Sequence, residues 1–243
     1  VMGEEVEQHE VQSVFVDFQI DGIPFYYHFA FNPVFAERNV VNFFKGLPIL
    51  ETKLRLGFII DSQRFDVDNS RQRISDKEKT KGQLIKAFSE LVKVLKEIKV
   101  SDPHKFDYIY KAIAATKYQE GEDFKYIKEA FQEVFVPFFE EFVLTASGDY
   151  EKIDNVRSFA ENYEVPLKEI GITEYKWIDD SIKKDLHRHK IDVGRIDFST
   201  LLSDAEPLKL AEWINNLSAN DYSEFNKLSN AHKNERGVQE VKI

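Results

Sequence analysis

The sequence of 243 residues contains no cysteine and only one methionine. Without cysteine the chain forms no disulfide, no thiolate metal site and no cysteine nucleophile. It also lacks an apolar run near the roughly 20 residues that cross a bilayer. Glycine-rich phosphate loops, GxSxG and HExxH are absent as well. We therefore expect no membrane partner, no cofactor and no bound metal, and a non-catalytic protein is favoured over an enzyme.

Positive charge is the scarcer sign, since 33 basic residues face 43 acidic ones and the net charge is −10. A field of this sign repels nucleic acid and anionic membranes, although a local basic patch can override it. Hydrophobic residues make up 42% of the chain, which suits a globular core, and 21 of the residues are phenylalanine. The composition favours a soluble, cytoplasmic protein with aromatic faces.

The clearest local pattern is a β-hairpin over residues 14–29. Asp21-Gly22 is a preferred pair for a two-residue type I′ turn, and the flanking residues alternate in polarity. The face predicted to be buried contains Val14, Val16, Phe18, Ile20, Ile23, Phe25, Tyr27 and Phe29. The opposite face contains Phe15, Asp17, Gln19, Pro24, Tyr26 and His28. Pro24 has no N–H to donate, which fits an outer edge at that end of its strand. On this face Phe15, Pro24, Tyr26 and His28 are candidate interaction residues.

Residues 11–68 are predicted to form a small ββαββ-type unit. Asn32-Pro33 marks the start of a helix that would end before Gly46. Alternation from Leu54 to Ile60 predicts a third strand, and residues 64–67 would return as a fourth. The arrangement is a small antiparallel sheet with one helix on its apolar face.

Residues 69–83 are polar and highly charged without an apolar period, which predicts a charged linker or loop. Residues 84–235 are then predicted to be a helical domain. Its first helices cover about 84–99 and 101–117, and an aromatic stripe follows over 124–143, interrupted by Pro137, which predicts a kink or break. Shorter helices are expected near 150–163, 166–189, 205–217 and 220–232. The fold class is therefore α+β, with a small N-terminal sheet followed by a mainly helical array.

Glu51-Thr52-Lys53 places a carboxylate and an ammonium on one face of a predicted strand. Over these three residues the chain resembles metal-dependent nucleases of the PD-(D/E)xK type. The resemblance implies that Glu51 and Lys53, with an upstream acid, hold Mg²⁺ and orient a water for phosphodiester attack. The upstream acid would be Asp17 or Asp21, and Asp21 is better explained as the turn residue. The alternative interpretation is an ordinary ion pair on a solvated sheet edge.

The most basic stretch of the chain covers residues 183–195. Its cationic residues are Lys183, Lys184, Arg188, Lys190 and Arg195. They form a candidate nucleic-acid surface, although a helix C-terminus also collects positive charge because its dipole favours it. His187 and His189, two residues apart, project to opposite sides of a helix and do not form a zinc pair.

The leading functional hypothesis is a non-catalytic adaptor or assembly protein. It would dock a protein partner, or a second copy of itself, through an aromatic-rich face or the hairpin edge. A Mg²⁺-dependent nuclease using Glu51 and Lys53 is one alternative. A nucleic-acid-associated accessory protein using residues 183–195 is the other.

Overall fold

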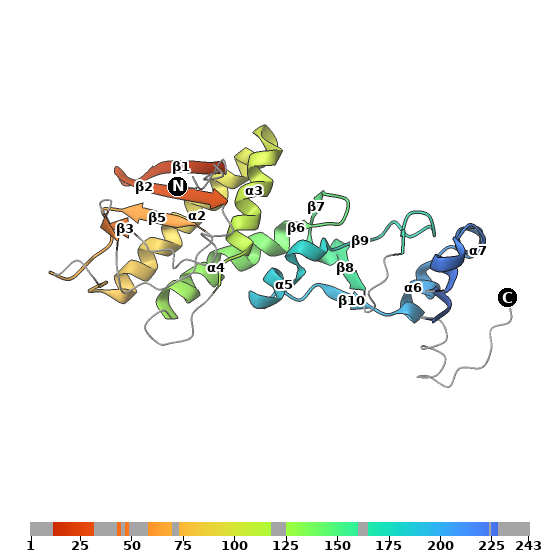
Figure 1. Cartoon of the computed structure of the whole chain (residues 1–243). Coiled ribbons are helices and arrows are strands. Elements are labelled where there is room, and N and C mark those ends of the chain that lie inside the picture. Colours follow the sequence, from red (N-terminus) through yellow and green to blue (C-terminus); the bar gives the residue numbers. More distant parts are fainter. Residues whose placement is uncertain are drawn as a thin grey trace, which may run out of the picture. The chain divides into compact units, whose positions relative to one another are not determined.

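The fold was examined in a computed structural model, which describes residues 12–31, 43–44, 47–48, 58–69, 73–117, 125–159, 165–223 and 225–227 (Figure 1). The fold is α+β, as predicted: an antiparallel sheet at the N-terminus precedes a mostly helical region. Two compact units share the chain. Unit 1 comprises Val1–Phe138 and Lys184–Lys190, and unit 2 comprises Phe139–Lys183 and Ile191–Ile243. The domain limits predicted from the sequence stay a prediction. No helix in the described ranges has the length and apolarity needed to span a membrane.

The hairpin of unit 1 forms in the predicted register. Strands β1 (Gln12–Ile20) and β2 (Ile23–Phe31) pair antiparallel, with Val16 opposite Tyr27 and Phe18 opposite Phe25. Asp21 has φ 50° and Gly22 has φ 73°, the two positive values that a type I′ turn requires. The local turn chemistry therefore fixes which side chains of both strands share a face.

The sheet of unit 1 continues beyond the hairpin in the order β1-β2-β5-β3-β4. Its other strands are β3 (Phe43–Phe44), β4 (Leu47–Pro48) and β5 (Ile59–Ser62). β5 shares residues 59–60 with the third strand predicted from Leu54 to Ile60, and residues 54–57 of that prediction lie outside the described ranges. The helix predicted to end at residue 45 is wrong at Phe43 and Phe44, because these two residues form β3. This strand pairs with both β4 and β5. Residues 32–42 of that prediction also lie outside the described ranges.

The fourth strand predicted at residues 64–67 is wrong. The chain turns after β5, where the backbone N–H of Arg64 donates to Ser62 Oγ at 3.2 Å. Val67 then makes an isolated antiparallel bridge to Ile74 instead of extending the sheet. The alternating polarity of residues 64–67 therefore belongs to a turn and not to a strand.

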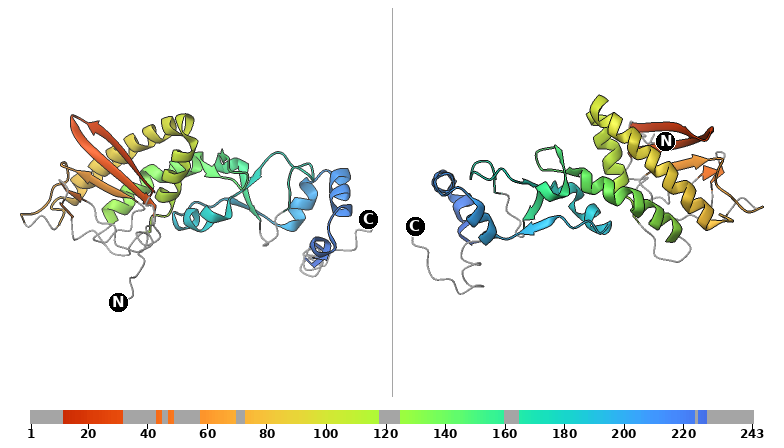
Figure 2. Two further views of the ribbon diagram at one scale, coloured as in Figure 1. Left: turned by 45° about the horizontal axis from the view of Figure 1, so that its top comes forward. Right: turned by 180° about the vertical axis from the view of Figure 1, so that it is seen from behind.

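Three helices cover one side of this sheet, namely α2 (Lys77–Ser101), α3 (Pro103–Ala114) and the first part of α4 (Lys125–Glu141). Both views in Figure 2 show α2 lying across one face of the sheet. α2 begins at Lys77, so the linker predicted over residues 69–83 is wrong from residue 77 onward. Asp76 caps this helix by accepting a hydrogen bond from the N–H of Lys79 at 2.9 Å. The first turns are polar because much of their surface is exposed.

Asp102 both ends α2 and starts α3. Its backbone N–H donates to the carbonyl of Ile98 at 2.7 Å, and its carboxylate accepts from the N–H of Lys105 at 3.0 Å. Pro103 follows as the first residue of α3, where a missing N–H costs nothing. One residue therefore satisfies backbone groups at two helix ends.

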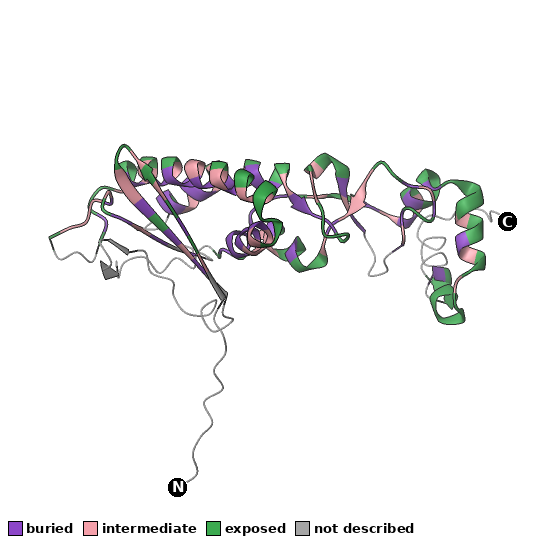
Figure 3. Ribbon diagram, turned by 90° about the horizontal axis from the view of Figure 1, so that it is seen from above, coloured by how far each residue is buried: buried purple, intermediate pink, exposed green. Residues whose placement is uncertain are grey.

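Aromatic rings fill the core of unit 1. Phe58, beside the start of β5, meets Phe88 of α2 at 6.0 Å between ring centroids and Phe135 of α4 at 6.4 Å. All three rings are at most 1% exposed. Pro137 lies inside α4, which continues past it to Glu141 without the predicted break. Figure 3 shows the buried residues of α2 along one side of the helix and exposed residues along the other.

Unit 2 contains a three-stranded parallel sheet in the order β10-β8-β9 and a two-stranded antiparallel sheet. Its strands are β6 (Val143–Leu144), β7 (Tyr150–Glu151), β8 (Val156–Phe159), β9 (Lys176–Trp177) and β10 (Gly194–Ile196). The helix predicted at 150–163 is therefore wrong, since β7, the 3₁₀ helix η2 (Ile153–Asn155) and β8 occupy its described part. The short segment VRSF has no helical or strand period long enough to decide between the two.

The remaining helices are α5 (Asp180–Arg188), α6 (Phe198–Asp204) and α7 (Pro207–Asn215). α5 confirms only the second half of the helix predicted at 166–189. α7 confirms most of the one at 205–217, and residues 219–223 and 225–227 are helical as predicted. Unit 2 has a hydrophobic core of its own, which contains Phe198, Trp213 and Phe225. Trp177 packs against this core and donates from Nε1 to the carbonyl of Val165 at 2.6 Å.

The aromatic core predicts a large stability difference between two positions of α2. Phe88→Ala removes a fully buried ring that contacts three other phenylalanines, and we expect it to lower the free energy of unfolding by about 3–5 kcal/mol. Val100→Ala, at a position 86% exposed on the same helix, should cost less than about 0.5 kcal/mol. Urea unfolding followed by circular dichroism measures both. Equal losses would contradict the placement of α2.

Candidate functional site

Large aromatic side chains are exposed on the hairpin side that faces away from α2. The outer hairpin face consists of Phe15, Asp17, Gln19, Pro24, Tyr26 and His28, which alternate with the buried residues of β1 and β2. Phe15 is 66% exposed and Tyr26 is 51% exposed, whereas Phe25 and Tyr27 on the other side are fully buried. The residues predicted for interaction therefore lie together on one surface.

Phe15 and His28 stack on this face from opposite strands. Their ring centroids are 4.3 Å apart and their planes differ by 1°. Burial lowers the pKa of His28, so its imidazole is neutral at pH 7. Its Nε2 is shielded from solvent and has no hydrogen-bond partner among the described residues. Asp17 is then the single charged group of the outer hairpin face at neutral pH.

The tip of the hairpin is held by an ion pair that sequence reasoning missed. The guanidinium of Arg64 donates to Asp21 Oδ2 at 2.7 Å, and this hydrogen bond lowers the pKa of Asp21. Ser62 Oγ also donates to the carbonyl of Pro24 at 3.2 Å. Pro24 lies one residue beyond the last β2–β5 pair, Phe25 with Ser62, so its missing N–H leaves that ladder intact although β2 is an inner strand. No sequence signal linked Arg64 to a turn 43 residues earlier.

The cationic residues of the basic stretch do not share one unit. Lys184, Arg188 and Lys190 belong to unit 1, whereas Lys183 and Arg195 belong to unit 2. Arg188 is occupied, because it pairs with Asp185 at 2.8 Å and donates to the carbonyl of Thr116. Lys183, Lys184 and Lys190 are exposed and form no ion pair with another described residue. Lys183 and Lys184 lie in the middle of α5, and Lys190 lies in the turn after its C-terminus, where the helix dipole favours positive charge.

His187 and His189 lie on opposite sides of the chain, as predicted: His187 is exposed and His189 is fully buried. The ring of His189 stacks on Phe131 at 5.2 Å, and Nε2 lies 2.7 Å from the carbonyl oxygen of Ala114. A carbonyl only accepts, so Nε2 carries the proton. Burial lowers the pKa of His189, and this outweighs the opposite effect of the Ala114 hydrogen bond. His189 is a neutral core residue of unit 1.

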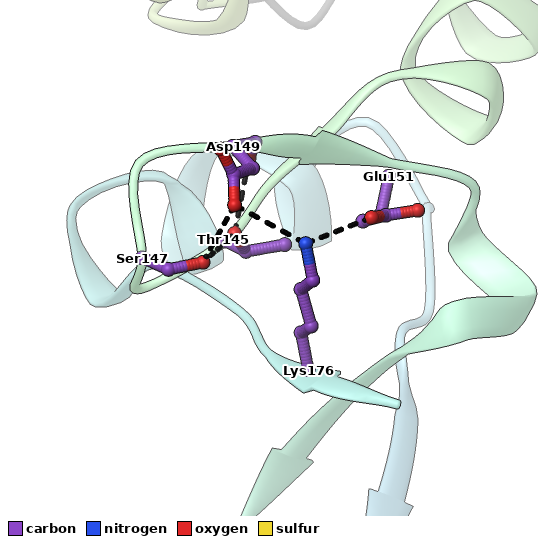
Figure 4. Close-up of polar contacts among 5 residues, drawn as sticks. All are labelled: Thr145, Ser147, Asp149, Glu151 and Lys176. Carbon is purple, nitrogen blue, oxygen red and sulfur yellow. Dashed lines mark hydrogen bonds and ion pairs between the residues drawn. The ribbon is translucent and has the colours of Figure 1, made fainter. Parts of the chain in front are cut away.

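A polar cluster in unit 2 was not anticipated from the sequence (Figure 4). Lys176 on β9 pairs with Glu151 at 2.9 Å and with Asp149 at 3.2 Å. Asp149 also accepts from Ser147 at 3.1 Å, and Thr145 Oγ1 donates to the carbonyl of Asp149 at 3.1 Å. The hydrogen bonds tie the β6–β7 turn to β9.

The protonation states in this cluster oppose acid–base catalysis. The hydrogen bond that Lys176 donates to Glu151, followed by the one it donates to Asp149, raises the pKa of Lys176, so the amine stays protonated. The hydrogen bond from Lys176 lowers the pKa of both carboxyl groups. A lysine base or nucleophile needs the opposite shift. The arrangement fits a structural ion-pair cluster.

The nuclease hypothesis receives no support from the described residues. Glu51 and Lys53 lie outside them, and Asp17 is an exposed residue of the outer hairpin face opposite Tyr26. Within the described ranges no group of three or more histidine, aspartate or glutamate residues is placed to hold a metal ion. The outer hairpin face is therefore the best-defined candidate site.

The burial of neutral His189 predicts that stability falls in mild acid. The unfolded chain takes up a proton near pH 6.5, whereas the folded chain does so only at lower pH. Stability is thus complete above pH 6.5 and is lost as the pH falls through the folded pKa, with a slope of at most about 1.4 kcal/mol per pH unit for one histidine.

Urea unfolding at pH 7.5, 6.5 and 5.5 tests this. His189→Gln should unfold more easily at pH 7.5 but show a shallower pH slope than the parent. His187→Gln, at the exposed position two residues earlier, is the matched control and should keep the slope of the parent. An unchanged slope in His189→Gln would contradict the assignment.

Comparison with known proteins adds no assignment to this geometry. No known protein family matches the chain. No curated protein shows significant similarity to it in sequence.

Proposed function

We propose that the chain is a non-catalytic interaction protein that docks a protein partner through its hairpin. The exposure of Phe15 and Tyr26, side by side with a stacked His28 on a rigid strand pair, carries this proposal. Aromatic side chains bury much area at little entropic cost and dominate protein interfaces. Because the ordered residues of β1 and β2 hold these rings in place, little conformational freedom is lost on binding.

The electrostatics of the outer hairpin face support a protein partner over a nucleic acid. At neutral pH the face carries one charge, the carboxylate of Asp17, and no cation. The whole chain has a net charge of −10. Phosphate backbones are bound by lysine and arginine, which this face lacks.

Replacing the exposed ring of Tyr26 tests the proposal. Two forms of the immobilised chain, Tyr26→Lys and the control Val100→Lys, are compared with the parent for proteins retained from a cell extract. A central aromatic residue of an interface contributes about 2 kcal/mol or more, so we expect Tyr26→Lys to reduce retention of a genuine partner by at least about tenfold. Val100→Lys, at an exposed position away from the hairpin, should retain it fully. If every retained protein binds all three forms equally, the hairpin is not the docking surface.

A nucleic-acid-associated role is the second candidate, favoured by the exposure of Lys183, Lys184 and Lys190 without ion pairs among the described residues. It predicts that a labelled single-stranded oligonucleotide binds at 50 mM salt and is released as salt rises. Lys183→Glu with Lys184→Glu should abolish this binding. Lys86→Glu, an exposed position of α2, should not. Binding that is insensitive to salt would exclude this role.

A further inference from the structure

The free edge of β1 is the least protected feature of the hairpin. β1 is the terminal strand of the sheet, nine residues long, and pairs only with β2 among the described residues. Edge strands usually carry lysine, proline or a bulge that prevents pairing with another chain. β1, with the sequence QSVFVDFQI, contains no lysine, arginine, proline or glycine, and its one charge is Asp17. An edge of this kind is a template for another strand.

The apolar side of the sheet is incompletely covered at this same edge. On β2 the inward side chains Phe25, Tyr27 and Phe29 are fully buried. On β1 the inward Val16 is buried, but Val14 and Phe18 on either side of it are only half-buried, although they lie opposite Phe29 and Phe25. The buried face thus continues beyond the last described strand. One more strand would cover it.

The hairpin register determines which backbone groups face outward. In a hairpin with a two-residue turn, the pair that closes the turn, Ile20 with Ile23, is hydrogen-bonded, and such pairs alternate along the strands. The remaining residues direct their N–H and C=O away from β2. On β1 the residues with outward backbone groups are Ser13, Phe15, Asp17 and Gln19. The backbone of an added antiparallel strand must form its hydrogen bonds with these four residues.

We propose that the partner is a second copy of this chain, joined antiparallel through β1 about a twofold axis at Val16. The inference rests on the proposed function, because it names the partner of the same hairpin. Centring on Val16, the middle residue of Gln12–Ile20, pairs the full length of the strand and aligns the outward backbone groups of Phe15 and Asp17. Inward, Val14 then lies beside Phe18 of the second copy, so each covers the other.

The other symmetric registers are less favourable. Centring on Asp17 places two carboxylates directly opposite each other, which is destabilising. Centring on Phe15 places Gln19 and Ile20 beyond the described strand of the second copy. Registers shifted by one residue oppose outward backbone groups to inward ones and form no ladder. The register centred on Val16 is therefore selected by hydrogen bonding, length and charge together.

Light scattering of the full chain over a range of concentrations and salt is the first test. We expect a dimer that strengthens as salt rises, because screening weakens the repulsion between two chains of net charge −10. Asp17→Pro removes an N–H that β2 does not use and should weaken the dimer at least about tenfold, since two hydrogen bonds are lost across the twofold axis. Val100→Lys, at a position 86% exposed on α2 and away from the hairpin, is the control and should dimerise like the parent.

Disulfide trapping is the second test and does not depend on the folding of Asp17→Pro. The chain has no cysteine, so a single substitution gives no background. Opposed residues in a non-hydrogen-bonded pair have Cα atoms about 4.5 Å apart, within disulfide range. Val16→Cys should form a linked dimer on mild oxidation. Leu208→Cys, 81% exposed in unit 2, should not.

The outcomes separate this inference from the proposed function. A parent chain that is monomeric at every concentration, or a Val16→Cys chain that does not link, overturns pairing through β1. Preferential linking of Phe15→Cys overturns the register centred on Val16. A monomer that still retains another protein in a manner sensitive to Tyr26→Lys keeps the docking function and excludes the second copy as the partner.

Discussion

Aromatic rings packed between one side of the sheet and the helices that cover it hold unit 1 together. Phe58 lies beside the start of β5, and its ring packs against Phe88 of α2 and Phe135 of α4. Because each strand directs alternate side chains to opposite sides, committing one side to the core leaves Phe15 and Tyr26 on the other. The exposed surface of the hairpin is therefore a geometric consequence of how its buried side is used.

The surroundings of three titratable groups shift their pKa values away from neutral pH. His28 and His189 are kept neutral by burial, whereas Lys176 is kept charged by two carboxylates. Groups that transfer protons in catalysis need a pKa near the working pH. A surface defined by shape and ring stacking, without such groups, is suited to binding.

Sequence reasoning succeeded where structure is determined locally. Asp21-Gly22 specifies its own turn, and the turn then fixes the register of every pair in β1 and β2 and places Tyr26 on the outer hairpin face. It failed for β8, whose four residues become a strand only because β9 and β10, distant in sequence, pair with it. Arg64 and the Lys176 cluster were missed for the same reason. Side chains that are distant in sequence and meet only in the folded chain leave no recognisable spacing pattern in the sequence.

The direct junction of α2 and α3 at Asp102 bears on the order in which the elements of unit 1 fold. Because Asp102 ends α2 and starts α3, the two helices are neighbours along the chain, and their contacts close only short loops. Such local contacts form fast, whereas the pairing of β2 with β5 must bring together residues about 30 positions apart. The helical pair is then available as a surface before the sheet is complete. We therefore expect the arrival of the hairpin on that surface to be the slow step of folding in unit 1.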